Sequence, residues 1–225
     1  MVETRTWRRG SGLIDWTYNL ADRHHQIKQL LADGYQRRIW IADKIERLLD
    51  ALGNFALVQD VTVDTWSGGE DSLAIASWQG AASRLRLVDF LQKTDEVVNI
   101  DFTLTLQCAT PKTNGKLKEL QIESGGSIFF FIELEDEGKL DLNTDTPIWL
   151  TFSLDVDIHA PISWGPVRDN TQNARLNGSR LSAFLHRLEQ DIPAEFIGVD
   201  APDYQGMVDR YGFFTPSIVG LDAIA

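Results

Sequence analysis

The sequence predicts an α+β fold. We expect an antiparallel meander sheet of five to seven strands, with a long N-terminal helix and a shorter C-terminal helix packed on one face. Apolar residues recur at helical spacing near the N-terminus, alternate with polar residues through much of residues 58–159, and return to helical spacing near residue 180. Strands of a parallel sheet, covered on both faces, read as continuous apolar runs, so this alternation indicates antiparallel strands with one wet face.

The N-terminal helix is predicted over residues 20–52, where the apolar stripe keeps its phase through Gly34. This favours one helix with a weak point at Gly34. The alternative is that Asp33 and Gly34 end a first helix, with glycine as a left-handed cap. An unbroken helix of this length would span roughly 50 Å, more than one sheet normally covers. Part of it is therefore expected to meet a second copy of the chain, although Gly34 and Arg38 in the stripe weaken a simple coiled coil.

The sheet is predicted from segments in which apolar and polar residues alternate. Residues 98–107 and 148–159 show the strongest alternation, and residues 60–66 and 73–79 are expected to form a hairpin. Residues 84–91 fit either a third strand or a short helix. Each strand is expected to bury one face and to leave the other in contact with water.

A second hairpin is predicted where residues 116–123 meet residues 127–135. Ser124, Gly125 and Gly126 lie between these segments, and glycines can adopt the positive φ that a tight turn requires.

The C-terminal part is predicted to be a long polar loop over residues 160–178, then a helix capped by Ser179 and ended by Pro193. The apolar residues beyond it are expected to drape over the domain. We therefore expect a single domain over residues 1–225, with a helical segment at 13–52, a sheet region at 58–159 and the remainder at 160–225.

Composition places the chain among ordinary globular proteins, with 43% apolar and 24% charged residues. Cys108 is the single cysteine, which excludes an internal disulfide and a cysteine-based zinc site and favours a cytoplasmic location. We expect no export signal and no membrane span, because the longest purely apolar run, residues 128–132, is far shorter than the roughly 20 residues a membrane helix needs.

The net charge of −12 is spread unevenly. Residues 1–50 hold nine basic and seven acidic side chains, whereas residues 51–225 hold twelve and 26. Such an acidic region repels phosphate backbones, so we expect no nucleic acid as partner. The basic N-terminal part is expected to neutralise the acidic sheet or, alternatively, to dock an acidic protein surface.

One local pattern could carry chemistry. Asp155, Asp157 and His159 alternate at the end of the predicted strand, so they should project from one face about 7 Å apart. Carboxylates and histidine suit a divalent metal such as Mn²⁺, Fe²⁺ or Zn²⁺, with His186 or His24 as a further ligand. The simpler interpretation is that these residues are the solvent side of an alternating strand.

No phosphate-binding loop, dinucleotide fingerprint or nucleophile elbow is present in the sequence. The seven tryptophans exceed the usual number, and tryptophan often anchors protein partners. The leading hypothesis is therefore a non-catalytic binding or adaptor protein without a cofactor, which forms a homo-oligomer or docks a protein partner through the long helix. The alternative is a metal-dependent hydrolase built on Asp155, Asp157 and His159.

Overall fold

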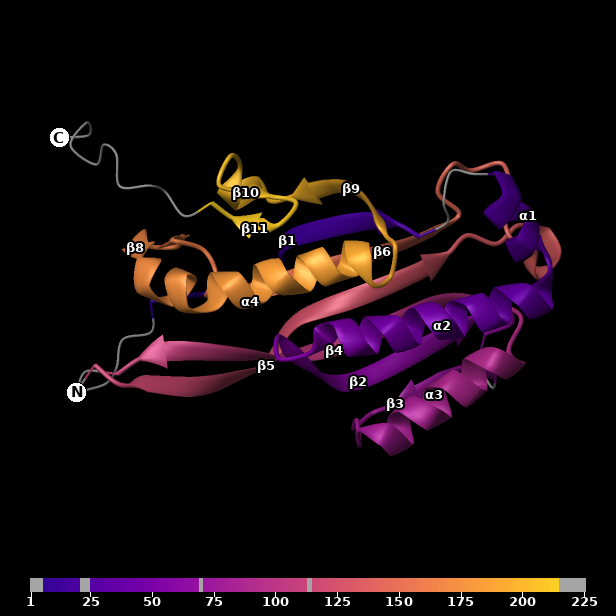
Figure 1. Cartoon of the computed structure of the whole chain (residues 1–225), viewed down its shortest axis with the longest axis horizontal. Helices are drawn as coiled ribbons and strands as arrows, with labels where there is room; N and C mark the ends of the chain where they lie inside the picture. The colour runs from indigo at the N-terminus through magenta and orange to yellow at the C-terminus, as the bar shows by residue number, and fades with distance from the viewer. Residues whose placement is uncertain (1–5, 21–24, 69–70, 113–114, 215–225) are drawn as a thin grey trace.

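The computed structural model describes residues 6–20, 25–68, 71–112 and 115–214. A seven-stranded antiparallel sheet forms its centre, in the order β3-β2-β4-β5-β6-β1-β9 (Figure 1). The strands are β1 (Arg9–Asn19), β2 (Ala56–Thr65), β3 (Leu73–Ile75), β4 (Val97–Pro111), β5 (Leu117–Ile132), β6 (Ile148–Val156) and β9 (Glu195–Asp200). The predicted fold class is confirmed.

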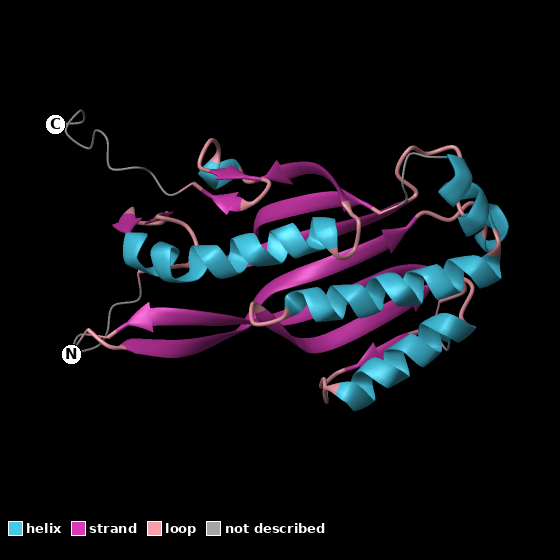
Figure 2. Cartoon of the chain, viewed as in Figure 1, coloured by secondary structure: helices cyan, strands magenta, loops and turns pink. Residues whose placement is uncertain are grey.

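The helices are α1 (His25–Ala32), α2 (Gly34–Leu52), α3 (Ala81–Lys93) and α4 (Thr171–Gln190). Figure 2 shows α2, α3 and α4 on the same side of the sheet. The apolar side chains of the strands point toward this side, and the core forms between the two layers, with Phe55, Phe152 and Phe184 in mutual ring contact. Burial of such large side chains is the main favourable term in folding.

The N-terminal helical stretch is divided at Asp33, which is the alternative that the sequence left open. Asp33 has an extended backbone and its side chain accepts a hydrogen bond from Gln36 N, at 2.9 Å. The division therefore comes from an N-cap that starts α2, and Gly34 is the first residue of that helix.

The first strand contradicts the prediction, which places residues 13–19 in the helical segment 13–52. Ile14, Trp16 and Tyr18 are fully buried, while Asp15 and Thr17 lie on the other face. β1 pairs with β6 on one side and β9 on the other. The sheet is therefore a meander only from β4 to β6, because β3 lies at the outer edge beside β2 and β1 enters between β6 and β9.

The predicted turn at Ser124–Gly126 is wrong, because β5 runs through it as one strand. Ile122 pairs with Leu106 and Gly126 with Leu104, so this strand carries extra residues opposite β4. Ser124 has a φ of 46°, and its N–H donates to the Gln59 side chain at 3.1 Å. The glycine signal thus marks a β-bulge within a long strand.

Residues 84–91 belong to the helix α3, the second of their two predicted forms. One other segment differs from the prediction. Helix α4 starts at Thr171 instead of Ser179, inside the predicted loop. Its first half is anchored by buried polar side chains: Asn177 accepts from Ala109 N at 2.7 Å and donates to Ala109 O at 2.9 Å.

Short elements complete the chain: β7 (Ile162–Ser163), β8 (Arg168–Asp169), η2 (Asp136–Gly138), η3 (Pro202–Tyr204), β10 (Val208–Asp209) and β11 (Gly212–Phe213). The part of the C-terminal segment that is described does pack on the domain. Its strand β9 extends the sheet at the edge of β1, and β11 lies against α4 (Figure 1).

Candidate functional site

The face of the sheet opposite α2 and α4 is the largest polar surface that the strands create. Their alternate side chains point away from the helices and, apart from the buried Asn19, are half-buried or exposed. Strand register arranges them in three rows, which together we call the open face. The rows are Asp64, Asn99, Phe131, Trp149, Asn19 and Glu195; Thr62, Asp101, Phe129, Thr151, Thr17 and Gly198; and Asp60, Thr103, Ser127, Ser153, Asp15 and Asp200.

Three aromatic rings lie in the middle of the open face. The centroids of Phe131 and Trp149, on neighbouring strands, are 4.2 Å apart, and those of Phe129 and Phe131 are 5.8 Å apart. All three side chains are only partly buried. The rings therefore form a continuous apolar strip, flanked by polar side chains on both sides.

The ionisable side chains of the three rows are all carboxylates. Burial, and then the neighbouring Asp64, raise the pKa of Asp101 above its ordinary value. Burial also raises the pKa of Asp155, which lies next along β6, with a further contribution from Asp15 and an opposing hydrogen bond from Gly12. The open face therefore gathers negative charge that the rows themselves do not neutralise.

Two asparagines flank the aromatic strip in the first row. Asn19 is 2% exposed, and neither its side-chain oxygen nor its nitrogen has a hydrogen-bond partner; the Asn99 Oδ1 atom is also enclosed without one. Buried amide groups without partners cost stability. Hydrogen-bonding capacity therefore remains unused beside Trp149 and Phe131.

The proposed metal ligands Asp155, Asp157 and His159 do not share one face, because β6 ends at Val156 and the chain turns there. Asp155 remains at the open face, where its Oδ1 accepts a hydrogen bond from Gly12 N at 2.7 Å. Asp157 and His159 are both buried, with 0% and 1% of their surface exposed. The alternation that suggested a common face stops where the strand stops.

Asp157 links the segments that contain Arg8 and Tyr204 to the end of β6. Its Oδ1 accepts from Arg8 N at 2.6 Å, and its Oδ2 accepts from the hydroxyls of Ser163, at 2.7 Å, and Tyr204, at 2.8 Å. Asn170 Nδ2 donates to the Asp157 carbonyl at 3.1 Å. These bonds hold the carboxylate among backbone and side-chain donors, which is the arrangement of a structural anchor.

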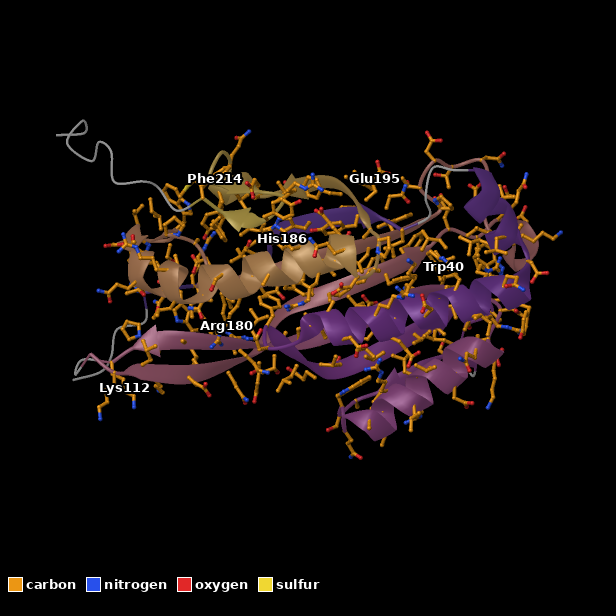
Figure 3. The ribbon with its side chains drawn as sticks, in the orientation of Figure 1. Trp40, Lys112, Arg180, His186, Glu195 and Phe214 are labelled. Carbon is orange, nitrogen blue, oxygen red and sulfur yellow. The ribbon has the colours of Figure 1, made fainter. Side chains whose placement is uncertain are left out.

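His159 lies in the core beside Phe55, with their ring centroids 5.9 Å apart. Burial, with a smaller effect from Arg180, lowers its pKa to about 3, so the ring is neutral at physiological pH. Arg180 extends from α4 toward β4, where it donates to Gln107 O at 2.9 Å (Figure 3).

The remaining ligand candidates do not complete a metal site. His186 stacks on Tyr211, with ring centroids 3.8 Å apart, and its Nδ1 is 2.8 Å from Ser182 O. His24 lies outside the described residues. Within residues 6–20, 25–68, 71–112 and 115–214, no group of three or more His, Cys, Asp or Glu side chains could hold a metal ion. The metal-dependent hydrolase hypothesis therefore gains no support.

Two concave regions lie away from the open face. A cavity of about 350 Å³ at the start of α4 is lined by Thr6, Lys118 and Asn173 among others, and a groove of about 630 Å³ lies between α2, β2 and α3. Neither lining includes a histidine or a cysteine. Cys108 is buried elsewhere, and burial raises the pKa of its thiol to about 12, which leaves it unreactive.

The basic side chains of α2 make contacts within the chain. Arg37 is buried and its Nη2 donates to Asp95 O at 2.9 Å. Lys44 donates to Ile192 O at 2.6 Å and lies over the ring of Trp40, which Figure 3 labels on α2. Arg38 pairs with Asp95 at 2.9 Å. Arg37 and Lys44 thus donate to backbone carbonyls, and among these three contacts Arg38–Asp95 alone pairs a basic side chain of α2 with an acidic one.

The fold and its open face define an α+β domain with one helical layer. No protein-family model matches the chain, and neither the curated proteins nor the solved structures include a significant match. None of the described helices is both long enough and apolar enough to cross a membrane.

The sequence indicated a wet sheet face but missed the aromatic strip on it. A signal was present: residues 128–132 are uniformly apolar within an otherwise alternating sheet. Such a run must place Phe129 and Phe131 on the polar face.

Proposed function

We propose that the chain is a non-catalytic binding protein of the cytosol that docks a protein partner on the open face. The observation that carries this proposal is the strip of Phe129, Phe131 and Trp149, which lies partly exposed at the centre of a polar sheet face. Aromatic residues ringed by polar ones are typical of protein-binding surfaces, where they supply most of the binding energy.

The other candidate sites support binding more than catalysis. Asp157 accepts hydrogen bonds from four donors of its own chain, three at the carboxylate and one at the backbone carbonyl, and His159 is 1% exposed and lies beside the Phe55 ring. A general acid or base has to reach the proton that it transfers. The cytosol is favoured because the single cysteine is buried as a thiol.

Affinity purification of the tagged chain tests the docking proposal. The double variant Phe131→Ser/Trp149→Ser removes the centre of the strip, and Leu85→Ser is the matched control, since Leu85 is 71% exposed on α3. We expect proteins that co-purify with the wild type and the control to be lost from the double variant. Identical recovery with all three chains, when circular dichroism confirms folding, would refute the proposal.

A second proposal is self-association through the first two helices. Leu30, Tyr35 and Ile39 are 47%, 59% and 41% exposed on α1 and α2, and apolar side chains that lie together on a surface often mark an interface. Light scattering after size-exclusion chromatography tests it: we expect a dimer that Tyr35→Ser/Ile39→Ser converts to a monomer. If the wild type remains a monomer at a protein concentration of about 100 μM, the proposal is contradicted.

A further inference from the structure

We propose that the partner segment bound by the open face is rich in arginine, with a guanidinium group lying on the rings of Phe131 and Trp149. The inference rests on the proposed function, because it names the chemistry of the partner at that same site.

Charge complementarity is the first argument. The carboxylates concerned are Asp15, Asp60, Asp64, Asp101 and Asp200, and the three rows contain no lysine, arginine or histidine. A second copy of the same face, an acidic peptide or a nucleic acid would bring like charges together, which costs free energy. A cationic segment instead relieves the repulsion that contributes to the raised pKa of Asp101.

The aromatic strip is the second argument. Tryptophan and phenylalanine attract cations placed over their faces, and tryptophan does so most strongly. The fold already uses this contact elsewhere: the Arg38 guanidinium carbon is 5.6 Å from the Tyr35 ring centroid and the Lys44 Nζ is 5.2 Å from that of Trp40. On the open face the rings of Phe131 and Trp149 have no such cation in their rows, so a partner can supply it.

The unpaired amide groups are the third argument, and they favour arginine over lysine as the bound cation. Asn19 and Asn99 lie beside the ring pair in the same row, with Asn19 Oδ1 and Asn99 Oδ1 lacking donors. A guanidinium group is planar, stacks on rings and carries five N–H donors, whereas an ammonium group is compact and carries three. Only the guanidinium can lie flat on a ring while its edge donates to an amide oxygen.

The spacing of the rows fits a peptide in an extended conformation. Side chains two residues apart on a strand are about 7 Å apart, and the rows of the open face have this same separation along each strand. Alternate arginines of an extended segment would therefore meet successive rows. One would lie over the Phe131–Trp149 pair in the first row while the next reaches Asp101 in the second.

Fluorescence anisotropy with labelled peptides tests the proposal on the full chain. Three dodecapeptides are compared, in which serine alternates with arginine, lysine or glutamate. We expect the arginine peptide to bind most tightly, the lysine peptide at least about three-fold more weakly, and the glutamate peptide not at all. Affinity should fall as salt rises, because the carboxylates are exposed or half-buried and salt screens their attraction for the peptide.

Three variants separate this site from general attraction by an acidic protein. Trp149→Leu should weaken the arginine peptide about 5- to 30-fold and reduce its advantage over lysine. Asp64→Asn/Asp101→Asn should weaken both cationic peptides. The control Asp43→Asn/Asp89→Asn removes the same charge from α2 and α3, on exposed carboxylates that pair with Arg47 and Lys93, and should change affinity less than two-fold.

Each outcome decides between the possibilities. Equal loss in the control and in Asp64→Asn/Asp101→Asn, or an unchanged affinity in Trp149→Leu, overturns the arginine site. Failure of every peptide to bind also overturns it. If affinity purification still loses its partner in Phe131→Ser/Trp149→Ser, the docking function stands with a partner of other chemistry; if it does not, both proposals fail.

Discussion

The Tyr204 hydroxyl donates a hydrogen bond to Asp157 Oδ2 at 2.8 Å, and this contact joins the C-terminal segment to the end of the strand β6. Tyr204 is fully buried, as is Asp157. Burial, followed by the hydrogen bond to Asp157, raises the pKa of Tyr204 above its ordinary value, so the phenol stays protonated and remains a donor.

Substitutions at this contact should destabilise the fold in a graded order. Tyr204→Phe removes one donor to a buried carboxylate and should lower the free energy of unfolding by about 1.5–3 kcal/mol. Asp157→Ala leaves Arg8 N and the hydroxyls of Ser163 and Tyr204 without an acceptor, so the loss should exceed about 3 kcal/mol. Urea denaturation measures both; a loss in Asp157→Ala no larger than that in Tyr204→Phe would contradict an anchoring role.

His159 should make the protein sensitive to acid. Its pKa is lowered to about 3 in the folded chain, by burial and by Arg180, against about 6.5 when unfolded. Below pH 6.5 the unfolded chain gains a proton that the folded chain does not, so stability falls as the pH falls, by roughly 3 kcal/mol at pH 4.5. Folded His159 becomes protonated only near pH 3, where this loss stops growing.

The variant His159→Gln isolates this effect from the many carboxylates, which titrate in both proteins. Unfolding free energies of the wild type and of His159→Gln are measured in urea at pH 7.0, 5.5 and 4.5. As the pH falls, the free energy of unfolding of His159→Gln should rise relative to that of the wild type. A constant difference across the three pH values would show that His159 is not the group responsible.

Glycine has a different role at two positions, and alanine substitutions should act in opposite directions. A Cβ at Gly126 would lie 2.6 Å from Ser153 O, a backbone atom of the neighbouring strand. Gly126→Ala should therefore destabilise the protein by about 1–3 kcal/mol through overpacking. Gly178 lies within α4 with nothing within 4 Å of its Cβ position, so Gly178→Ala should stabilise by about 0.5–1 kcal/mol. Thermal denaturation of both variants checks the opposite signs.

Local patterns in the sequence predicted the fold class because the central strands alternate clearly. Strand β4 places Ile100, Phe102 and Leu104 on the buried face, and β6 shows the same alternation of buried and partly exposed residues. β1 was missed although Ile14, Trp16 and Tyr18 also alternate. Its partner β6 is more than a hundred residues away, and no nearby turn signal indicates a pairing over such a distance.

The other errors arise where one residue type serves two structures. Glycines in a short polar segment occur both in hairpin turns and in β-bulges. The residues Ser124–Gly126 therefore do not show from sequence alone which of the two structures they form. Asn173 and Asn177 read as loop residues, but they are buried on α4 and bonded within the chain. The candidate metal residues failed to align because the end of the strand at Val156 depends on tertiary contacts around Asp157.

Asp101 should reduce stability at neutral pH, because the open face holds its charge half-buried beside Asp64. Its folded pKa is raised by burial and then by Asp64, so the charged form is disfavoured in the folded chain above that pKa. Asp101→Asn should therefore stabilise the protein at pH 7. Because much of the carboxylate is solvated, we expect a gain of only a few tenths of a kcal/mol. The gain in stability should vanish at pH 3, where the native carboxyl is protonated, and the matched substitution Asp89→Asn on α3 should give no gain.

If Asp101→Asn both raises the melting temperature and weakens binding of the arginine peptide, the carboxylate is retained for binding although it lowers stability. A destabilised Asp101→Asn variant would show instead that this carboxylate is part of the fold.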